Sequence, residues 1–153
     1  MNETAPMYVV NVEGAIHRGD EYLVCVRSEE EDHAPGSLGL VGGKAEIEEP
    51  TNDVLENTLR REIKEETGVK VEGLKYLESK MFVDDNGIPV VDIVFLCRHS
   101  EGKPEVKEPE EIASIEWMGP EEIAEDESTP PWTERSIRLA EEKRKKVENN
   151  RTE

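Results

Sequence analysis

The chain has 153 residues, a length that suits a single domain with a sizeable core. Its formal net charge is −18, so we expect no general binding to nucleic-acid polymers or to anionic membranes, both of which attract basic surfaces. No segment has the ~20 apolar residues of a membrane-spanning helix. The start, "MNETAPMYVV", lacks the basic region of a secretory signal, and a cytoplasmic location is therefore expected.

Two apolar segments near the N-terminus predict strands. They are "MYVVNVE" at residues 7–13 and "EYLVCVR" at residues 21–27, and "HRGD" between them predicts a turn. The polar segment "SEEEDHAPGSLG" that follows predicts a loop.

A helix is predicted for residues 53–67, where apolar residues recur at helical spacing. At its start, Asp53 and Glu56 have the spacing of a capping box. At its end, Gly68 is a natural residue to leave the helix, because glycine adopts the left-handed conformation readily.

The second half of the chain predicts further strands and a closing helix. The expected elements are a strand at 69–79, a hairpin at 80–98, a strand at 112–119, a short helix or turn at 120–126 and an amphipathic helix from about residue 132. Asn86-Gly87 suits the tight turn of the hairpin. This order predicts a mixed α/β or α+β fold, with one domain over residues 1–148 and a frayed tail at 149–153.

Three glutamates near the end of the first helix, Glu62, Glu65 and Glu66, are candidate metal ligands. They are related by i,i+3 and i,i+4 steps, so their carboxylates are expected to converge on one face, which overlaps the apolar stripe. Oxygen-only ligands suit hard cations such as Mg²⁺. The alternative is a solvated acidic face, or one that collects cations weakly at many sites.

The segment "GGK" at residues 42–44 lies ahead of this helix. It offers accessible backbone and a cation where a phosphate group can approach, so Gly43 and Lys44 are candidate substrate contacts. Metal ligands beside phosphate contacts suit phosphoryl or pyrophosphoryl chemistry. In such chemistry metals neutralise phosphate oxygens, and a carboxylate orients or deprotonates water.

Residues 42–69, "GGKAEIEEPTNDVLENTLRREIKEETGV", resemble the Nudix box, G-x5-E-x7-R-E-U-x-E-E-x-G-U with U apolar. The second half matches at every fixed position: Arg61, Glu62, Ile63, Glu65, Glu66, Gly68 and Val69. The first half has four extra residues. Counted from Gly43, the first box glutamate is Glu49; counted back from Arg61, its position falls on Asp53. We prefer Glu49, because it keeps the glycine-to-glutamate spacing.

The resemblance extends over most of the chain, since "EYLVCVR" and "PEEIASIEWMGPEEI" are similar to strands that flank the box in this family. It implies an α/β/α sandwich with a mixed β-sheet between helices. It also implies Mg²⁺- or Mn²⁺-dependent hydrolysis of a nucleoside diphosphate linked to another moiety, such as a nucleoside triphosphate or an ADP-ribose-like compound. The expected partner is thus a small nucleotide, and a homodimer is a further expectation because family members are often dimers.

The resemblance also implies roles for the box residues. Glu65 and Glu66 are expected to be the principal metal ligands and Glu62 a further or water-bridged ligand, with the carbonyl oxygen of Gly42 also reaching the metal. Arg61 is expected to pair with and orient a box carboxylate.

Outside the box, the resemblance implies roles for Arg27 and for one more glutamate. Arg27, at the end of a strand, is expected to reach substrate. Many family members have a glutamate, as metal ligand or general base, six residues before the tryptophan of the closing strand. Here that residue is Glu111, and Glu108 and Glu110 are near competitors.

A second hypothesis from another class is a non-catalytic Nudix-fold module that binds a nucleotide or senses a metal. The altered first half of the box supports it. The intact second half, from Arg61 to Val69, counts against it.

Overall fold

The computed structural model of the chain describes residues 5–31, 33–46 and 50–152. Its elements in chain order are β1 (Val9–Arg18), β2 (Glu21–Arg27), β3 (Leu38–Gly39), β4 (Val41–Lys44), α1 (Val54–Thr67), β5 (Lys70–Val83), β6 (Pro89–Glu101), β7 (Ile112–Met118), α2 (Pro120–Glu125) and α3 (Pro131–Thr152). Among the described residues, no helix is long and apolar enough to cross a membrane.

The strands form one mixed sheet with the order β3-β2-β1-β6-β5, in which β4 also pairs with β1 and β7 with β2. The pairing of β1 with β6 is parallel, and the other described pairs are antiparallel. Strand β1 pairs with β2 only at His17↔Tyr22 and Arg18↔Glu21. Over Asn11–Gly14 it pairs with β4 instead. The sheet therefore divides at this end, where β2 and β4 separate from each other along β1.

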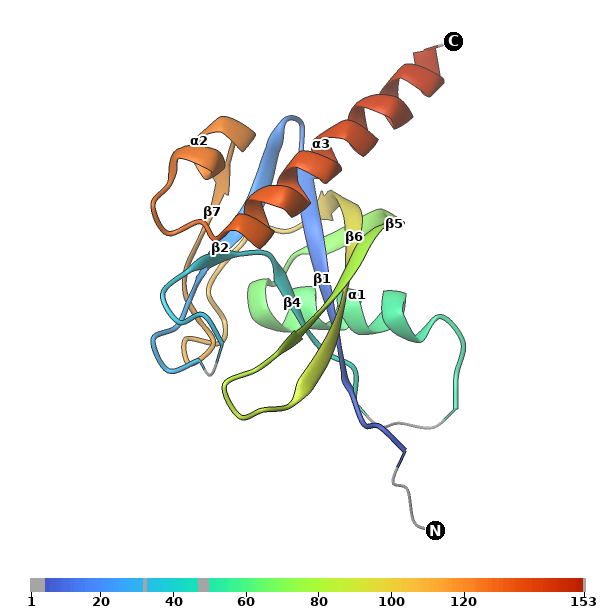
Figure 1. The fold of residues 1–153 in the computed structure, drawn as a ribbon. Coiled ribbons are helices and arrows are strands. Elements are labelled where there is room, and N and C mark those ends of the chain that lie inside the picture. Colours follow the sequence, from blue (N-terminus) through green and yellow to red (C-terminus); the bar gives the residue numbers. More distant parts are fainter. Residues whose placement is uncertain (1–4, 32, 47–49, 153) are drawn as a thin grey trace.

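Helices cover both faces of the sheet, as the sandwich prediction requires. Figure 1 shows α1 on one side and α3 on the other, with the sheet between them. Along β1, Val12 and Ile16 point into the core under α1, whereas Ala15 belongs to the core under α2 and α3. This alternation follows from the two-residue period of a strand.

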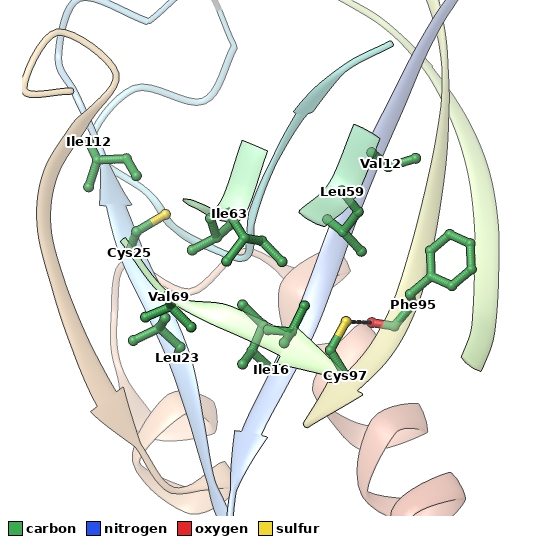
Figure 2. Packing of buried hydrophobic residues seen from close by; sticks show 12 residues of the cluster. Val12, Ile16, Leu23, Cys25, Leu59, Ile63, Val69, Phe95, Cys97 and Ile112 are labelled. Atoms are coloured by element: carbon green, nitrogen blue, oxygen red, sulfur yellow. Dashed lines mark hydrogen bonds between the residues drawn. The ribbon is translucent and has the colours of Figure 1, made fainter. Parts of the chain in front are cut away.

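The core under α1 contains the side chains that position the helix. Leu59 and Ile63, one helical turn apart, are fully buried against Val12, Ile16 and their neighbours on the sheet (Figure 2). Both cysteines of the chain also lie in this core and are free thiols. Burial of Leu59 and Ile63 fixes the rotation of α1, which in turn sets the direction of the glutamates that follow.

The ends of α1 fit one prediction and contradict another. Gly68 adopts the left-handed conformation at φ 78° and donates its backbone N–H to the Lys64 carbonyl, as expected of a C-terminal cap. The predicted capping box at Asp53 is wrong. Asp53 has φ 54° and makes no side-chain cap hydrogen bond, because a capping side chain needs an extended backbone to reach the first turn.

Other boundaries differ from the prediction in length. Strand β1 continues to Arg18, the short strand β3 forms within the segment predicted as loop, and β4 forms ahead of α1, where no strand was predicted. Helix α3 continues to Thr152, so the predicted start of a frayed tail at residue 149 does not coincide with a helix end. The Arg144–Glu148 ion pair, one turn apart at 2.8 Å, supports these last turns.

Candidate active site

The three glutamates of α1 do not share one environment. Glu66 is 5% exposed, and the side chain of Glu62 is 12% exposed. The side chain of Glu65 is 48% exposed and pairs with Arg61 at 3.3 Å. Glu65 is the most exposed of the three, but the same guanidinium nitrogen of Arg61 donates to both Glu62 and Glu65, so these two carboxylates lie beside each other. At about 100° per residue, Glu62 and Glu66 lie about 40° apart around the helix, but Glu65 lies about 100° from Glu66.

The loop between β6 and β7 brings further carboxylates to Glu66. The backbone N–H of Lys107 donates to the Glu66 carbonyl and that of Glu105 to the Thr67 carbonyl, both at 3.0 Å. We call these two bonds the backbone strap. Beyond it, Glu108 and Glu111 turn toward the helix, and carboxylate oxygens of Glu66, Glu108 and Glu111 lie within 4.8 Å of one another.

Burial and mutual repulsion disfavour the ionised form of the carboxylates in this acidic cluster. Burial, followed by the hydrogen bond with Glu111 and the charges of nearby carboxylates, raises the pKa of Glu66 to about 10. The hydrogen bond with Glu111, followed by burial, raises the pKa of Glu108 to about 7. Burial also raises the pKa of Glu62, against the opposing effect of Arg61. The cluster therefore favours a bound cation or a retained proton.

The donor set of the cluster fits a hard divalent cation. Glu66, Glu108 and Glu111 each offer an oxygen within the common 4.8 Å span, and oxygen ligands are those that Mg²⁺ and Mn²⁺ take in proteins. A cation here would also relieve the repulsion that raises the pKa of Glu66. Arg61 donates to Glu62 at 3.1 Å and to Glu65 at 3.3 Å, so it holds two further carboxylates beside the cluster.

The two box glycines sit where a side chain has no room. A Cβ on Gly42 would collide with the Val12 carbonyl across the β1–β4 pair. A Cβ on Gly43 would collide with the carboxylate of Glu62. The glycines thus let β4 approach β1 and α1 closely, and they leave the backbone beside Glu62 accessible.

A cavity of about 250 Å³ joins most of the predicted site residues. It is lined by Asn11, Cys25, Arg27, Glu31, Leu40, Gly42, Gly43, Lys44, Glu46, Glu62, Glu66, Glu111 and Ile112. Arg27 donates from Nε to the His33 carbonyl at 2.7 Å and pairs with Glu31 at 3.3 Å. We call this the acidic cavity. It places two cationic side chains, those of Arg27 and Lys44, in the same space as the carboxylates.

A second cavity, of about 400 Å³, shares Asn11, Arg27, Glu31 and Lys44 with the first. On its floor the amide of Asn11 donates to Asp92 at 2.7 Å. Burial, followed by the charge of Asp92, raises the pKa of Glu13 well above its ordinary value. We call this the sheet cavity, because its polar floor comes from β1 and β6.

Comparison with known proteins identifies the family. The NUDIX domain model matches residues 7–140 of the chain. The chain belongs to the Nudix hydrolase family. The NAD-capped RNA hydrolase NudC of Mannheimia succiniciproducens is 32% identical to it over 120 residues. That match covers 75% of this chain and 41% of NudC, so the chain spans less than half the length of this curated relative.

Solved Nudix structures have the same fold. A MutT NUDIX hydrolase from Burkholderia pseudomallei is 27% identical with a TM-score of 0.74, over 87% of this chain and 98% of that one. The NUDIX domain of Shewanella oneidensis NrtR, solved with ADP ribose, is 19% identical with a TM-score of 0.71, over 91% and 90% of the two chains. The latter likeness supports the α/β/α sandwich alone.

The Nudix box supplies part of the lining of the acidic cavity, including Glu62 and Glu66, and the rest comes from other segments. Glu49, the preferred first box glutamate, lies outside the described residues. Glu108 joins the cluster beside Glu111, although it was only a competitor for that position. The sheet cavity was not predicted. Its sequence signal is a charged residue inside an apolar strand, Glu13 in "VVNVEGAI" and Asp92 in "VVDIVFL".

Proposed function

We propose that the chain is a divalent-metal-dependent Nudix pyrophosphohydrolase, which cleaves the pyrophosphate bond of a nucleoside diphosphate linked to another moiety. The observation that carries this proposal is the cluster of Glu66, Glu108 and Glu111, of which Glu66 and Glu111 line a cavity that Arg27 and Lys44 also line. A diphosphate needs cations on its oxygens and a carboxylate near the attacking water, and this cavity offers both.

The metal would be held by the carboxylates and backbone on one side of the acidic cavity. Glu66 and Glu111 are the proposed direct ligands with Glu108, and Glu62, Glu65 and the Gly42 carbonyl are further ones. Bound Mg²⁺ or Mn²⁺ would supply Lewis-acid polarisation of the diphosphate and neutralise its charge.

The remaining residues would position the substrate and handle the proton. Lys44, Arg27 and the backbone at Gly43 would contact phosphate oxygens from the side of the cavity opposite the cluster. Arg61 would orient the carboxylates of Glu62 and Glu65, with which it forms ion pairs. The carboxylate oxygen of Glu111 that does not bind the metal would accept the proton of the attacking water, because Glu111 lies at the cluster but on a loop separate from α1.

The compounds named for the relatives share one chemical group. NAD-capped RNA and ADP ribose both contain a diphosphate flanked by nucleoside or ribose. A nucleoside triphosphate, the other predicted substrate, offers the same linkage. The net charge of −18 disfavours binding of an RNA body, so we propose a small cytoplasmic nucleotide as substrate.

The proposal is tested by product release from a panel of nucleoside triphosphates, ADP-ribose and dinucleotides, with Mg²⁺ or with EDTA. We expect metal-dependent turnover of at least one compound, and we expect Glu66→Gln to lower its kcat/KM by at least about a hundredfold. Glu142→Gln, at an exposed site on α3, is the matched control and should retain wild-type turnover.

Two results would contradict the proposal. Turnover that persists in Glu66→Gln would show that the acidic cluster does not hold the catalytic metal. Absence of turnover on every compound, with nucleotide binding intact, would instead support the non-catalytic binding module.

A further inference from the structure

The floor of the sheet cavity holds a buried carboxylate with unused acceptor capacity. Asp92 is 1% exposed, and its Oδ1 atom accepts one hydrogen bond, from Asn11. Its Oδ2 atom is buried and has no hydrogen-bond donor within the described parts of the chain. Glu13 also hydrogen-bonds with Asp92, which needs one proton between the two carboxyls, and together they still have more acceptor sites than this proton and the Asn11 amide satisfy. Leaving such an atom unsatisfied costs about 1–3 kcal/mol, so its retention needs an explanation.

A cationic donor lies beside this acceptor. The Nζ atom of Lys80 is 3.8 Å from Asp92 Oδ2, which is close enough for an ion pair but too long for a hydrogen bond. Nζ also lies 3.4 Å from the hydroxyl of Ser136, and the side chain of Lys80 is 24% exposed. The floor of the cavity therefore has a hydrogen-bond acceptor, Asp92 Oδ2, next to a donor, Lys80 Nζ.

Aromatic rings line the same cavity. The His33 and Phe82 rings stack with centroids 4.3 Å apart and planes 16° from parallel. Trp132 lies 5.8 Å from His33 and is 43% exposed. Burial and the charge of Arg27 lower the pKa of His33, which favours the neutral ring. Flat rings of this kind bind the faces of other flat, conjugated rings.

The sheet cavity is continuous with the proposed reaction site. Asn11, Arg27, Glu31 and Lys44 line both cavities. A volume of about 400 Å³ is in the range that encloses a small organic ligand. A molecule with its diphosphate in the acidic cavity can therefore extend its next group over Asp92 and Lys80.

We propose that the sheet cavity binds the heterocyclic base of the substrate, and that Asp92 and Lys80 recognise a base edge carrying a hydrogen-bond donor next to an acceptor. Asp92 Oδ2 accepts from an amino group or ring N–H, and Lys80 donates to the adjacent carbonyl oxygen or ring nitrogen. The aromatic rings of His33, Phe82 and Trp132 cover the base. This inference rests on the proposed function for the position of the diphosphate.

The test measures binding without catalysis. Wild-type protein in EDTA is titrated with GDP, ADP and two analogues that lack a donor, 1-methylguanosine diphosphate and purine riboside diphosphate, by calorimetry. We expect at least one parent compound to bind about tenfold or more tightly than its analogue, because one buried hydrogen bond is lost in the analogue. The guanine and adenine pairs show which base has the matching edge.

Variants link this discrimination to the cavity. Asp92→Asn keeps the side-chain volume but exchanges an acceptor for an amide, so we expect it to erase the preference for the parent compound. Asp85→Asn, on the same hairpin but exposed and outside the cavity lining, should keep the preference. If Asp92→Asn does not fold, Phe82→Leu serves instead and should weaken both members of a pair by a similar factor.

The outcomes separate this inference from the proposed function. Equal affinity for parent and analogue in both pairs would overturn the base site, whatever the turnover assays show. Retained discrimination in Asp92→Asn would overturn the role of Asp92. Discrimination that is lost in Asp92→Asn would support the base site even if no compound is hydrolysed, because binding in EDTA needs neither metal nor turnover.

Discussion

Two glutamates on opposite faces of the sheet, Glu141 partly buried and Glu66 buried, show how differently one fold treats the same carboxylate. On the α3 face, Glu141 accepts hydrogen bonds from the Tyr22 hydroxyl at 2.7 Å and from two guanidinium nitrogens of Arg144 at 2.7 and 3.1 Å. Burial opposes its ionisation, but these bonds outweigh burial and lower the pKa of Glu141. On the α1 face, burial and neighbouring carboxylates raise the pKa of Glu66 to about 10.

The difference separates an acid that holds the fold together from one that we propose as a metal ligand. The α3 face repeats its pattern at Glu78, which accepts from the Ser136 hydroxyl at 2.6 Å and from Arg135 at 3.3 Å. These bonds attach α3 to the sheet. The acidic cluster around Glu66 instead brings like charges together, which lowers stability unless a proton is retained or a cation binds, as we propose.

The largest expected effect on stability comes from removing Glu141, the glutamate whose carboxylate accepts several hydrogen bonds. Glu141→Ala leaves the buried guanidinium of Arg144 without its principal partner and the hydroxyl of Tyr22 without its acceptor. We expect the free energy of unfolding to fall by about 2–4 kcal/mol, measured by urea denaturation. Glu142→Ala, at the exposed next position, is the control and should change it by less than about 0.5 kcal/mol. Equal effects at the two positions would contradict the comparison.

Removing the carboxylate of Glu66, which lies among other carboxylates, should change stability in the opposite direction. The folded-state pKa of Glu66 lies above its ordinary value of 4.5, so the folded protein holds this proton more tightly than the unfolded chain. The resulting stability is present below about pH 4.5 and is lost as pH rises toward 10. In EDTA, we therefore expect Glu66→Gln to be more stable than wild type at pH 8, by on the order of 1 kcal/mol.

Thermal unfolding in EDTA between about pH 5 and pH 9 measures this effect. Wild type should lose stability across this range more steeply than Glu66→Gln. Glu65→Gln, at the more exposed position, should follow wild type. A Glu66→Gln variant less stable than wild type at pH 8 would show that the carboxylate is stabilising and not strained.

The smallest expected change in stability comes from removing a single hydrogen bond on the α3 face, the one between Tyr22 and Glu141. Tyr22→Phe removes the hydroxyl that donates to Glu141 but leaves the Arg144 pair in place, so we expect a loss of about 1 kcal/mol in urea denaturation. Tyr76→Phe is the matched control, because that hydroxyl bonds Ser79 on a side chain that is 53% exposed. It should change stability by less than about 0.5 kcal/mol. A larger loss in Tyr76→Phe would contradict the assignment.

The features that could be predicted from the sequence are those that depend on residues close together along the chain. The helix α1, its end at Gly68 and its glutamates follow from periodicity and from a motif contained in one segment. The resemblance also placed Glu111 beside the box, and the structure brings it to Glu66. One prediction within that segment failed, because the left-handed backbone of Asp53 prevents the capping box that the sequence pattern predicts.

The unpredicted part depends on contacts between distant segments. Asn11 and Asp92 are 81 positions apart, and only the parallel pairing of β1 with β6 brings them together. A crossover pairing of this kind leaves no periodic signal in either strand. The strands β3 and β4 were missed for a related reason, because pairing with β2 and β1 stabilises segments too short to show a pattern.

The backbone strap has a consequence for redesigning the proposed metal site. Glu105 and Lys107 attach the loop to α1 through main-chain atoms, so substitutions at positions 108 and 111 leave the attachment in place. The side chains at those positions can therefore be replaced while the loop stays attached to α1. Replacing one carboxylate there by histidine would shift the donor set from hard cations toward zinc or cobalt without redesign of the scaffold.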